Sequence, residues 1–408
     1  MRTVIREKLF WIAALGYFVD LFDLVLYGSV RVRSLHDLHV PEDQIFSVGT
    51  TLLNAQMLGM VVGGIAWGIL GDRKGRRSAL FGSILLYSVA TLLNAFVQSV
   101  PAYETLRFLA GLGLGGELGA AVTMVSEVMP KNWRSVGTAG VAALGCVGAA
   151  VGSAVAQMLP WKMAYLLGGV LGLFLMFTRL QMKETQVYVG ARTRVPSQHF
   201  ASWKLIFGSR DRLLRLLFCV LAGVPIWYVA GILAYFSPEF GRAFHVQGEV
   251  LAGTTITVGY LGSMIGDLVC GYLSSALKSR KKAYFIFLCA GALISIGHFF
   301  YSEGTSPFEF YFTRFLIGVA SGYYVVLLTW SSELFGTNVR ATMTTWTTNF
   351  VRASVIPLTM ALAAFKPTFG LLQSSCGIGV VCFVVAALAA ANLKDTFHTE
   401  IEFIETAI

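Results

Sequence analysis

The chain has 408 residues, of which 56% are apolar and 13% are charged, whereas a soluble globular domain carries about 25% charged residues. This composition excludes a protein whose entire surface faces water. The formal net charge of +9 is compatible with a nucleic-acid ligand. Whether the protein binds nucleic acid is therefore judged from the positions of its basic residues.

The apolar residues gather in stretches of about twenty, the length that a helix rising about 1.5 Å per residue needs to cross a hydrocarbon core of about 30 Å. A transmembrane barrel is excluded, because its strands alternate apolar and polar residues over about ten positions. The first six predicted helices lie near residues 8–30, 45–70, 78–98, 103–129, 136–159 and 161–179. Six more lie near residues 213–240, 249–275, 282–301, 307–335, 341–365 and 369–394. The sequence predicts an all-α membrane protein with twelve transmembrane helices.

The first helix follows Arg2, Arg6 and Lys8, as a secretory signal would, but it is too long for one and carries Asp20 and Asp23. We therefore expect it to remain in the protein. The cysteines all lie in apolar stretches without the paired spacing of a metal site or a disulfide framework, so they are interpreted as packing residues and no metal site is expected. They are Cys146, Cys219, Cys270, Cys289, Cys376 and Cys382.

The basic residues concentrate at the amino terminus, in every second loop and after the last helix, as the positive-inside rule describes. Clusters lie at 73–77, 131–134, 192–212 and 278–282, and the intervening loops hold few basic residues. The positive charge is therefore interpreted as topological, and no nucleic-acid partner is expected. The pattern predicts a multi-pass protein of a bacterial inner membrane with both termini and the central linker in the cytoplasm.

The two sets of six helices are related by an internal duplication. The run beginning at Arg107 resembles the run beginning at Arg314, and GGIAWGILGDRKGRRSA from Gly63 resembles GDLVCGYLSSALKSRKKA from Gly266. Because an even number of spans separates equivalent positions, the two halves share one orientation and enclose a cavity between them. The expected units are an N-terminal bundle at 1–179, a cytoplasmic linker at 180–212, a C-terminal bundle at 213–395 and a short tail at 396–408.

The loop after the second helix carries the pattern GxLxDRxGRR and resembles the signature loop of the major facilitator superfamily. Its residues are Gly68, Leu70, Asp72, Arg73, Gly75, Arg76 and Arg77. Further runs resemble motifs of metabolite:proton and aromatic-acid:proton symporters within that superfamily: VDLFDLVLYG in the first helix, RFLAGLGLGGELGAAVTMVSEVMPKNWR in the fourth, KETQVYVG in the linker and NFVR in the eleventh. The resemblance implies two pseudo-symmetric six-helix bundles, transport by alternating access, and protons as the coupling ion with no other cofactor.

Three departures from known transporter motifs are present. The second copy of the signature loop has Ser275 where the first has Asp72, so the two halves are not expected to gate identically. The linker motif has Gln186 in place of a proline. The fifth helix lacks the GPxxGG pattern of drug:proton antiporters, which favours uptake over efflux.

GLGLGG at 111–116 has the spacing of a dinucleotide fingerprint without the required preceding strand, and it is interpreted as helix packing.

Charged residues inside the predicted helices are costly and are therefore candidates for function. Asp23 and Arg107 lie at comparable depths in the first and fourth helices, where they can pair, and making and breaking that pair would load and release a proton. Sugar:proton symporters resemble this design. A static ion pair between two helices is the alternative. Asp20, one turn away, is a second candidate for the titrating group, and Glu117 either relays protons or hydrogen-bonds a neighbouring helix.

Arg352 lies about eleven residues into the eleventh helix, near the midplane where transporter substrates bind. Its guanidinium can hold a carboxylate with two hydrogen bonds, and related anion carriers resemble it in having a basic residue in this helix. We therefore expect a small organic anion as substrate, with a buried pair to Asp267 or Glu117 as the alternative role of Arg352. Further expected substrate-binding residues are Asn349, Trp227, Tyr228, Tyr323, Tyr324 and Asp267, although membrane aromatics also serve packing and interfacial roles.

Charged residues at the cytoplasmic helix ends are predicted to close the inner side while the outer side is open, or alternatively only to fix topology. They are Asp72, Arg73, Arg76, Arg77, Glu127, Arg134, Glu333 and Arg340. We expect Glu333 with Arg340 and Arg280 to repeat, in the second half, the network of the first.

The leading hypothesis is a monomeric, proton-coupled importer of a small carboxylate metabolite. An exporter or antiporter of a drug-like or siderophore-like solute is the alternative. A membrane enzyme is disfavoured because HExxH, GxSxG and Walker patterns are missing from the sequence. A transport-dead sensor is disfavoured because the tail of about fifteen residues cannot fold alone.

Overall fold

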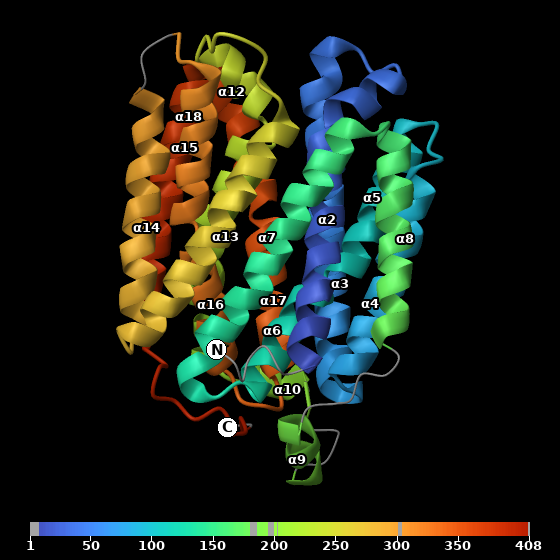
Figure 1. Cartoon of the computed structure of the whole chain (residues 1–408). Helices are drawn as coiled ribbons and strands as arrows, with labels where there is room; N and C mark the ends of the chain where they lie inside the picture. The colour runs from blue at the N-terminus through green and yellow to red at the C-terminus, as the bar shows by residue number, and fades with distance from the viewer. Residues whose placement is uncertain (1–7, 180–185, 195–199, 202, 301–303, 407–408) are drawn as a thin grey trace.

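The computed structural model describes residues 8–179, 186–194, 200, 201, 203–300 and 304–406 (Figure 1). Arg2, Arg6 and the first part of the predicted linker motif, KET at 183–185, lie outside the described residues. The described residues contain helices and no strands.

The first half consists of α2 (Lys8–Asp37), α3 (Ile45–Lys74), α4 (Arg76–Asn94), α5 (Val100–Leu114), α6 (Glu117–Val128), α7 (Arg134–Met158) and α8 (Trp161–Arg179). Two short helices follow, α9 (Gln186–Arg194) and α10 (Trp203–Phe207). The second half consists of α11 (Arg210–Trp227), a π-helix (Tyr228–Ala234), α12 (Ser237–Ala243), α13 (Ala252–Ala276), α14 (Arg280–Gly297), α15 (Pro307–Ala320), α16 (Tyr323–Glu333), α17 (Arg340–Ala353) and α18 (Val355–Asn392). Short 3-10 turns lie at Glu42–Gln44, Lys131–Trp133 and His298–Phe300.

These helices confirm the predicted membrane fold. Nine helical stretches of the described chain are long and apolar enough to cross a membrane, and the stretch Arg340–Asn392 contains two crossings. Its helix bends at Gly370, whose φ of 78° is accessible to glycine without a Cβ clash. The shorter helices α4 and α8 supply the remaining crossings of the twelve.

Four predicted helices are interrupted within the membrane, which the sequence prediction did not include. The fourth breaks at Gly115 and Gly116, and the tenth breaks at Ser321 and Gly322, where glycines favour a turn. The seventh continues after Pro225 as a π-helix, and the eleventh breaks at Ser354 before a proline at 357. Proline lacks the N–H that a continuous helix requires, which explains the last two interruptions.

The two halves stand side by side, with both described chain ends and α9 at one end of the molecule (Figure 1). We call this end the linker end and the opposite one the far end. The halves meet where α7 packs along α13 and where α3 packs along α17. In the duplication, these are the fifth helix on the eighth and the second on the eleventh, so the interface is itself pseudo-symmetric.

Glycines bring the helices of each half into close contact. A Cβ at Gly63 would lie 2.0 Å from the Leu112 carbonyl oxygen, and one at Gly111 would lie 2.0 Å from the Gln56 carbonyl oxygen. The second half repeats this at Gly266, where a Cβ would lie 2.0 Å from the carbonyl oxygen of residue 319. Since no side chain fits in this space, the structure confirms that GLGLGG is a packing motif.

Candidate substrate and coupling site

A small cavity lies between the halves, beside the breaks in the seventh, tenth and eleventh helices. We call it the central cavity. Its volume of about 60 Å³ is room for only a few water molecules, because a cavity needs at least about 10–15 Å³ to hold one. Discontinuous helices commonly build the substrate site of a transporter, because their freed backbone groups and termini face the cavity. The lining residues are Tyr17, Leu21, Leu24, Ala142, Cys146, Ile226, Trp227, Ala230, Tyr260, Ser263, Asp267, Ser321, Tyr324, Leu328 and Arg352.

Arg352 reaches this cavity from the last turn of α17 and pairs with Asp20 of α2. Its Nη2 lies 3.3 Å from Asp20 Oδ2, and the two side chains are 2% and 0% exposed. The sequence analysis did not consider Asp20 as a partner of Arg352. The second nitrogen, Nη1, is buried and makes no hydrogen bond to a described residue. The guanidinium therefore joins the two halves while keeping a donor available.

Asp23 and Arg107 lie within the first half, away from the central cavity. Asp23 accepts a hydrogen bond from Thr91 (2.8 Å), and Arg107 Nε donates to Asn94 (3.3 Å). The two charges attract each other, but no ion pair within 4.0 Å joins them, so the expected direct pair is absent here. The partners in these hydrogen bonds, Thr91 and Asn94, belong to α4. The sequence analysis had considered only the first and fourth helices and had therefore missed them. The guanidinium of Arg107 also stacks 4.9 Å from the Tyr165 ring centroid.

Glu117 begins α6 directly after the break in the fourth helix and is fully buried. Its carboxyl group acts electrostatically on Asp20, which lies across from it on α2. Asn349 does not line the cavity, because its Nδ2 donates to the carbonyl groups of Gly115 (2.7 Å) and Thr345 (2.8 Å). Asn349 thereby ties α17 of the second half to the break in the fourth helix.

Of the other residues expected to bind substrate, Trp227, Tyr324 and Asp267 line the central cavity. The remaining two aromatics point elsewhere. Tyr228 donates to the Ser375 carbonyl (3.0 Å), and Tyr323 packs edge-on against Tyr284.

Several cavity residues were missed by the sequence analysis: Tyr17, Cys146, Tyr260, Ser263 and Ser321. A signal existed for Tyr17, which lies one turn before Asp20 and therefore on the same helix face.

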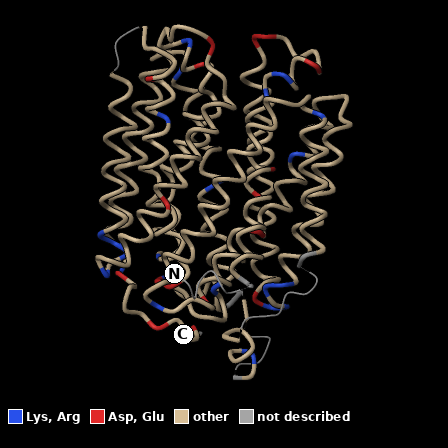
Figure 2. Tube along the Cα trace, viewed as in Figure 1, with Lys and Arg blue, Asp and Glu red and all other residues tan. Residues whose placement is uncertain are grey.

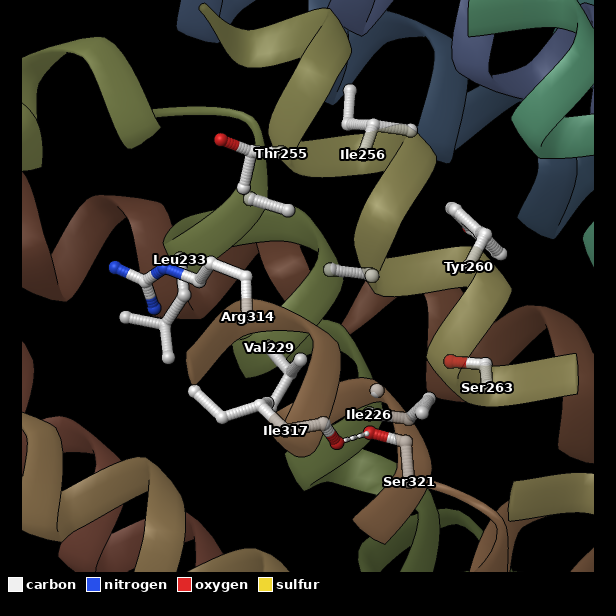
Figure 3. Close-up of a pocket in the computed structure, with 14 residues that line it drawn as sticks. Ile226, Val229, Leu233, Thr255, Ile256, Tyr260, Ser263, Arg314, Ile317 and Ser321 are labelled. Carbon is white, nitrogen blue, oxygen red and sulfur yellow. Dashed lines mark hydrogen bonds between the residues drawn. The ribbon is translucent and has the colours of Figure 1, made fainter. Parts of the chain in front are cut away.

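A second space, the side cavity, adjoins the central cavity within the second half (Figure 3). It has a volume of about 70 Å³ and shares Ile226, Ala230, Tyr260, Ser263 and Ser321 with the central cavity. Figure 3 shows Tyr260, Ser263 and Ser321 on one side and Arg314 with Thr255 on the other. Arg314 lines the side cavity and stacks 4.7 Å from the Phe310 ring centroid. The side cavity therefore extends from the central cavity toward a second buried cation.

The linker end is closed by two glutamates that each bind arginines from both halves. Glu127 lies 3.0 Å from Arg76 of its own half and 3.2 Å from Arg340 of the other. Glu333 lies 2.9 Å from Arg280 of its own half and 3.6 Å from Arg134 of the other. The expected pairing of Glu333 with Arg340 within one half is therefore wrong. Arg340 pairs with Glu127 of the first half, and Glu333 pairs with Arg134 of the first half. At this end, ion pairs therefore cross the interface between the two halves.

Asp72 adds a contact that its counterpart cannot make. Its carboxylate accepts the backbone N–H groups of Ala341 (3.2 Å) and Thr342 (2.8 Å) at the N-terminus of α17, where helices favour an anion. Ser275, in the second copy, instead donates to the Asn132 carbonyl (2.9 Å). This difference is consistent with the expected inequality of the two halves.

The two other predicted gating residues lie at the edge of this closure. Arg73 donates to the Ala201 carbonyl (3.4 Å), and Arg77 is exposed. Figure 2 shows charged residues concentrated at both ends of the molecule and sparse between them.

Replacing Glu127 or Glu333 with Gln is expected to open the linker end and slow transport, with substrate affinity changed less than about twofold. Removing one partner of a buried pair typically costs about 3–5 kcal/mol, and the part of this loss that comes from the arginine of the other half falls on the closed state. Spin labels at Asn132 and Lys278, which lie on opposite halves at this end, should move apart. Glu402→Gln is the matched control, because Glu402 is exposed at the same end. An unchanged label distance in both gate variants would contradict the gating role.

The segment Leu393–Thr406 crosses the linker end and contacts both halves. Glu400 pairs with Lys131 of the first half (3.0 Å), and Glu405 pairs with Arg212 (3.2 Å) and Arg215 (3.2 Å) of the second. Thr396 also donates to Glu333 of the closure (2.7 Å). The tail therefore contributes to the closed linker end.

Deleting residues 396–408 is expected to favour opening at the linker end without changing the central cavity, because it removes the contacts of the tail with the first half, such as Glu400 with Lys131, and keeps Asp395, which accepts hydrogen bonds at the start of α14. The same spin-label pair should show a larger open fraction than in the full chain. Glu405→Gln, which weakens the contacts of Glu405 with Arg212, Arg215 and the Gly336 N–H, should give a smaller shift in the same direction. A deletion variant whose label distances match those of the full chain would show that the tail plays no part in closure.

The far end is also closed. Arg31 of α2 lies 2.9 Å from Glu239 of α12, and the Tyr235 hydroxyl donates to the Leu24 carbonyl (3.2 Å). Ser153 of α7 donates to the Gly253 carbonyl of α13 (2.8 Å). A wider space of about 880 Å³ lies outside this closure, lined by residues of both halves. Contacts between the two halves therefore lie at both ends of the central cavity.

Comparison with known proteins agrees with this architecture. The family model described as Major Facilitator Superfamily matches residues 13–360. A putative metabolite transport protein of Haemophilus influenzae is 29% identical over 81% of this chain and 82% of its own. A cis,cis-muconate transport protein of Acinetobacter baylyi is 25% identical over 95% of this chain and 94% of its own.

Among solved structures, the proton:xylose symporter XylE bound to 6-bromo-6-deoxy-D-glucose superposes with a TM-score of 0.76 at 15% identity, covering 97% of each chain. That likeness shows the fold of twelve membrane helices in two bundles. The family consists of membrane transporters rather than enzymes, and the match covers most of this chain. The chain belongs to the Major Facilitator Superfamily.

Proposed function

We propose that this transporter carries a small organic anion into the cell together with a proton. The observation that carries the proposal is the buried pair between Asp20 and Arg352 at the central cavity. A substrate carboxylate and the Asp20 carboxylate would compete for one guanidinium. Protonation of Asp20 removes its charge, so Arg352 is then available to a carboxylate from outside.

This competition supports coupling through the charge of the occluded cavity. The empty carrier holds Arg352 with ionised Asp20, and the loaded carrier holds Arg352 with the substrate carboxylate and protonated Asp20. Both states bury the same net charge. A carrier with the proton alone, or with the anion alone, would bury an uncompensated charge, which costs several kcal/mol in a medium of low polarity. The empty carrier and the fully loaded carrier therefore change between the outward-facing and inward-facing conformations. The carrier with the proton alone or the anion alone does so rarely.

Two features support a small, planar or aromatic acid. The cavity has room for only a few water molecules in this conformation and has aromatic side chains from both halves in its wall: Tyr17, Trp227, Tyr260 and Tyr324. The relative from Acinetobacter baylyi is named for an unsaturated dicarboxylate, cis,cis-muconate. We infer that the carrier works as a monomer, since the central cavity is completed by the two halves of one chain.

The linker end is proposed to face the cytoplasm of a bacterial inner membrane, because basic residues are concentrated there: Arg73, Lys74, Lys131, Lys278, Lys281 and Lys282. In intact cells, an impermeant thiol reagent should label a cysteine at Glu42, on the far end, and should leave one at Arg192, on α9, unlabelled until the membrane is permeabilised. Equal labelling of both before permeabilisation would contradict this orientation.

Transport by the purified protein in liposomes tests the function. An imposed proton gradient, acidic outside, should drive accumulation of labelled benzoate or a similar small acid above equilibrium, and a protonophore should abolish it. The neutral sugar xylose is the control solute and should not accumulate. Accumulation that requires an acidic interior would favour an exporter or antiporter, and equilibration without accumulation would exclude proton coupling.

A further inference from the structure

The proposed exchange between Asp20 and Arg352 does not use the side cavity. This cavity lies between α13, α15 and the π-helix that continues α11, and its volume is about 70 Å³. An apolar cavity of about 150 Å³ holds benzene, which has six carbon atoms, so a space of this size suits a group of about three. The side cavity therefore matches a small alkyl substituent rather than a second solute molecule.

The wall of the side cavity is largely apolar. Two hydroxyl groups in the wall, those of Thr255 and Ser321, each donate to the backbone carbonyl four residues earlier, at 3.1 Å and 2.9 Å. A water molecule in this space would need two to four polar partners, whereas an alkyl group needs none. Five branched aliphatic side chains line the cavity: Ile226, Val229, Leu233, Ile256 and Ile317 (Figure 3). The wall therefore favours an apolar occupant.

The side cavity meets the central cavity along residues that line both. Five residues are shared, and three of these, Ala230, Ser263 and Ser321, have small side chains. Arg352 lines the central cavity and not the side cavity. A solute can therefore keep its carboxylate at Arg352 in the central cavity while a substituent enters the side cavity past the small side chains.

Gly259 of α13 leaves room in the side cavity, which it lines. A Cβ at Gly259 would lie 3.9 Å from the Arg314 carbonyl oxygen and, among the described residues beyond its own part of the helix, within 4 Å of no other atom. Gly262 and Gly266 of the same helix differ, because a Cβ there would lie 2.2 Å and 2.0 Å from backbone oxygens of α15. Glycine weakens a helix relative to alanine. Close packing explains the glycines at 262 and 266, but at 259 the missing side chain only adds space to the cavity.

We propose that the side cavity is a subsite for an apolar substituent of the transported acid, and that Gly259 keeps this subsite open. The carrier then prefers acids with a substituent of about one to three carbon atoms and discriminates against longer ones. This inference rests on the proposed function, because it takes Arg352 as the partner of the substrate carboxylate.

Two other roles for the side cavity make different predictions. If it is an unused packing void, filling it should raise thermal stability and change the affinities of all acids alike. If it is space that the helices need when the carrier reorients, filling it should slow transport of all acids alike and leave their relative affinities unchanged. A subsite differs from both, because filling it changes the ranking of the acids.

The test measures equilibrium binding of benzoate and of its methyl, ethyl, isopropyl and tert-butyl derivatives, substituted at the meta or the para position. In the series whose substituent faces the side cavity, each added carbon up to isopropyl should tighten binding about fourfold, the gain expected for burying one CH₂ group. The tert-butyl derivative should bind more weakly than the isopropyl one, because it exceeds the space. A gain of less than twofold throughout both series would overturn the inference.

A variant that fills the cavity and one that enlarges it then identify the subsite. Gly259→Val should reduce the affinity ratio of isopropylbenzoate to benzoate to within about twofold of one. Ile317→Ala should reverse the order of the last two acids, so that the tert-butyl derivative binds more tightly than the isopropyl one. This gain of affinity cannot result from misfolding. Gly377→Val is the matched control, because Gly377 is an exposed helical glycine of α18 with nothing described within 4 Å of a Cβ. A ranking retained in Gly259→Val, or lost in Gly377→Val, would contradict the subsite.

The outcome also separates this inference from the proposed function. If benzoate binds, needs Arg352 and accumulates with a proton gradient, but alkyl groups give no gain, only the subsite fails. If none of the acids binds, or if Arg352→Ala leaves their binding unchanged, the proposed anion transport fails and the subsite fails with it. If Gly259→Val slows transport of every acid and keeps their ranking, the side cavity serves reorientation, and the subsite is wrong.

Discussion

Asp20→Asn is expected to abolish accumulation driven by a proton gradient while leaving exchange of substrate across the membrane intact. Asparagine resembles protonated aspartate in size and in its lack of charge. Arg352 is then permanently available to the substrate carboxylate, and the loaded carrier keeps its balanced charge. Exchange requires only that the loaded carrier reorient in both directions, whereas net uptake requires the empty carrier to return.

That return is the step that the substitution blocks. Without ionised Asp20, the empty carrier would bury the Arg352 guanidinium without its partner at 3.3 Å. An unpaired buried charge costs several kcal/mol, and each 1.4 kcal/mol slows a step about tenfold. Net uptake should therefore fall by two orders of magnitude or more, and counterflow of labelled substrate without a gradient should stay within a few-fold of the unmodified protein.

Asp23→Asn is the matched control, because it makes the same chemical change one turn along the same helix. The sequence alone pointed to Asp23 as the proton carrier, with Asp20 as the second candidate. The geometry favours Asp20, since Asp23 is bonded to Thr91 inside the first half. Asp23→Asn should therefore keep accumulation, at a lower rate. The reverse result, with coupling lost in Asp23→Asn and retained in Asp20→Asn, would return the proton to Asp23 and Arg107.

The sequence identified the fold and most of the residues discussed here for a physical reason. A charged side chain in an apolar stretch is so costly that Asp20, Asp23, Arg107, Glu117 and Arg352 stand out without any structure. The helical repeat and the duplication then fix the arrangement of the helices around a central cavity. What they do not fix is the partner of each charge.

Two examples show why partners could not be predicted. Asp20 and Asp23 are three residues apart, so their side chains point about 60° apart around the helix axis, enough for one to face Arg352 and the other α4. The duplication gives Glu333 two equivalent candidates, Arg340 in its own half and Arg134 in the other. Only the packing of the halves decides between such arginines.

The cavity wall was harder to predict than the charges. Tyr260 is an ordinary aromatic in an apolar helix, and nothing in its type distinguishes a cavity residue from a packing one, whereas Tyr17 had a signal in its position one turn before Asp20. Tyr228 and Tyr323 were expected in the cavity and lie outside it, whereas their sequence neighbours Trp227 and Tyr324 line it. Adjacent residues on a helix point about 100° apart. When two neighbouring aromatics are both predicted to line one cavity, the prediction therefore fails for one of the two.

Arg352→Ala is expected to weaken substrate binding in every state of the carrier, and therefore to reduce exchange and gradient-driven uptake together. Truncating one partner of a buried hydrogen-bonded charge pair typically costs about 2–5 kcal/mol, which corresponds to a loss of affinity of roughly 30-fold or more. The same substitution leaves Asp20 without its cation, so part of the loss could come from a disturbed empty carrier.

The double variant Arg352→Ala with Asp20→Asn separates these causes, because it removes both charges and leaves no unpaired group. Its thermal stability should recover toward that of the unmodified protein, and its affinity for the acid should not. Arg352→Lys should restore binding only in part, since lysine keeps the charge but cannot form two parallel hydrogen bonds to a carboxylate. Equilibrium binding and counterflow, measured on all three variants, test this. If the double variant bound the acid as tightly as the unmodified protein, Arg352 would be a structural partner of Asp20. The substrate carboxylate would then have to bind a different cation, and Arg314, which lines the side cavity, is the candidate.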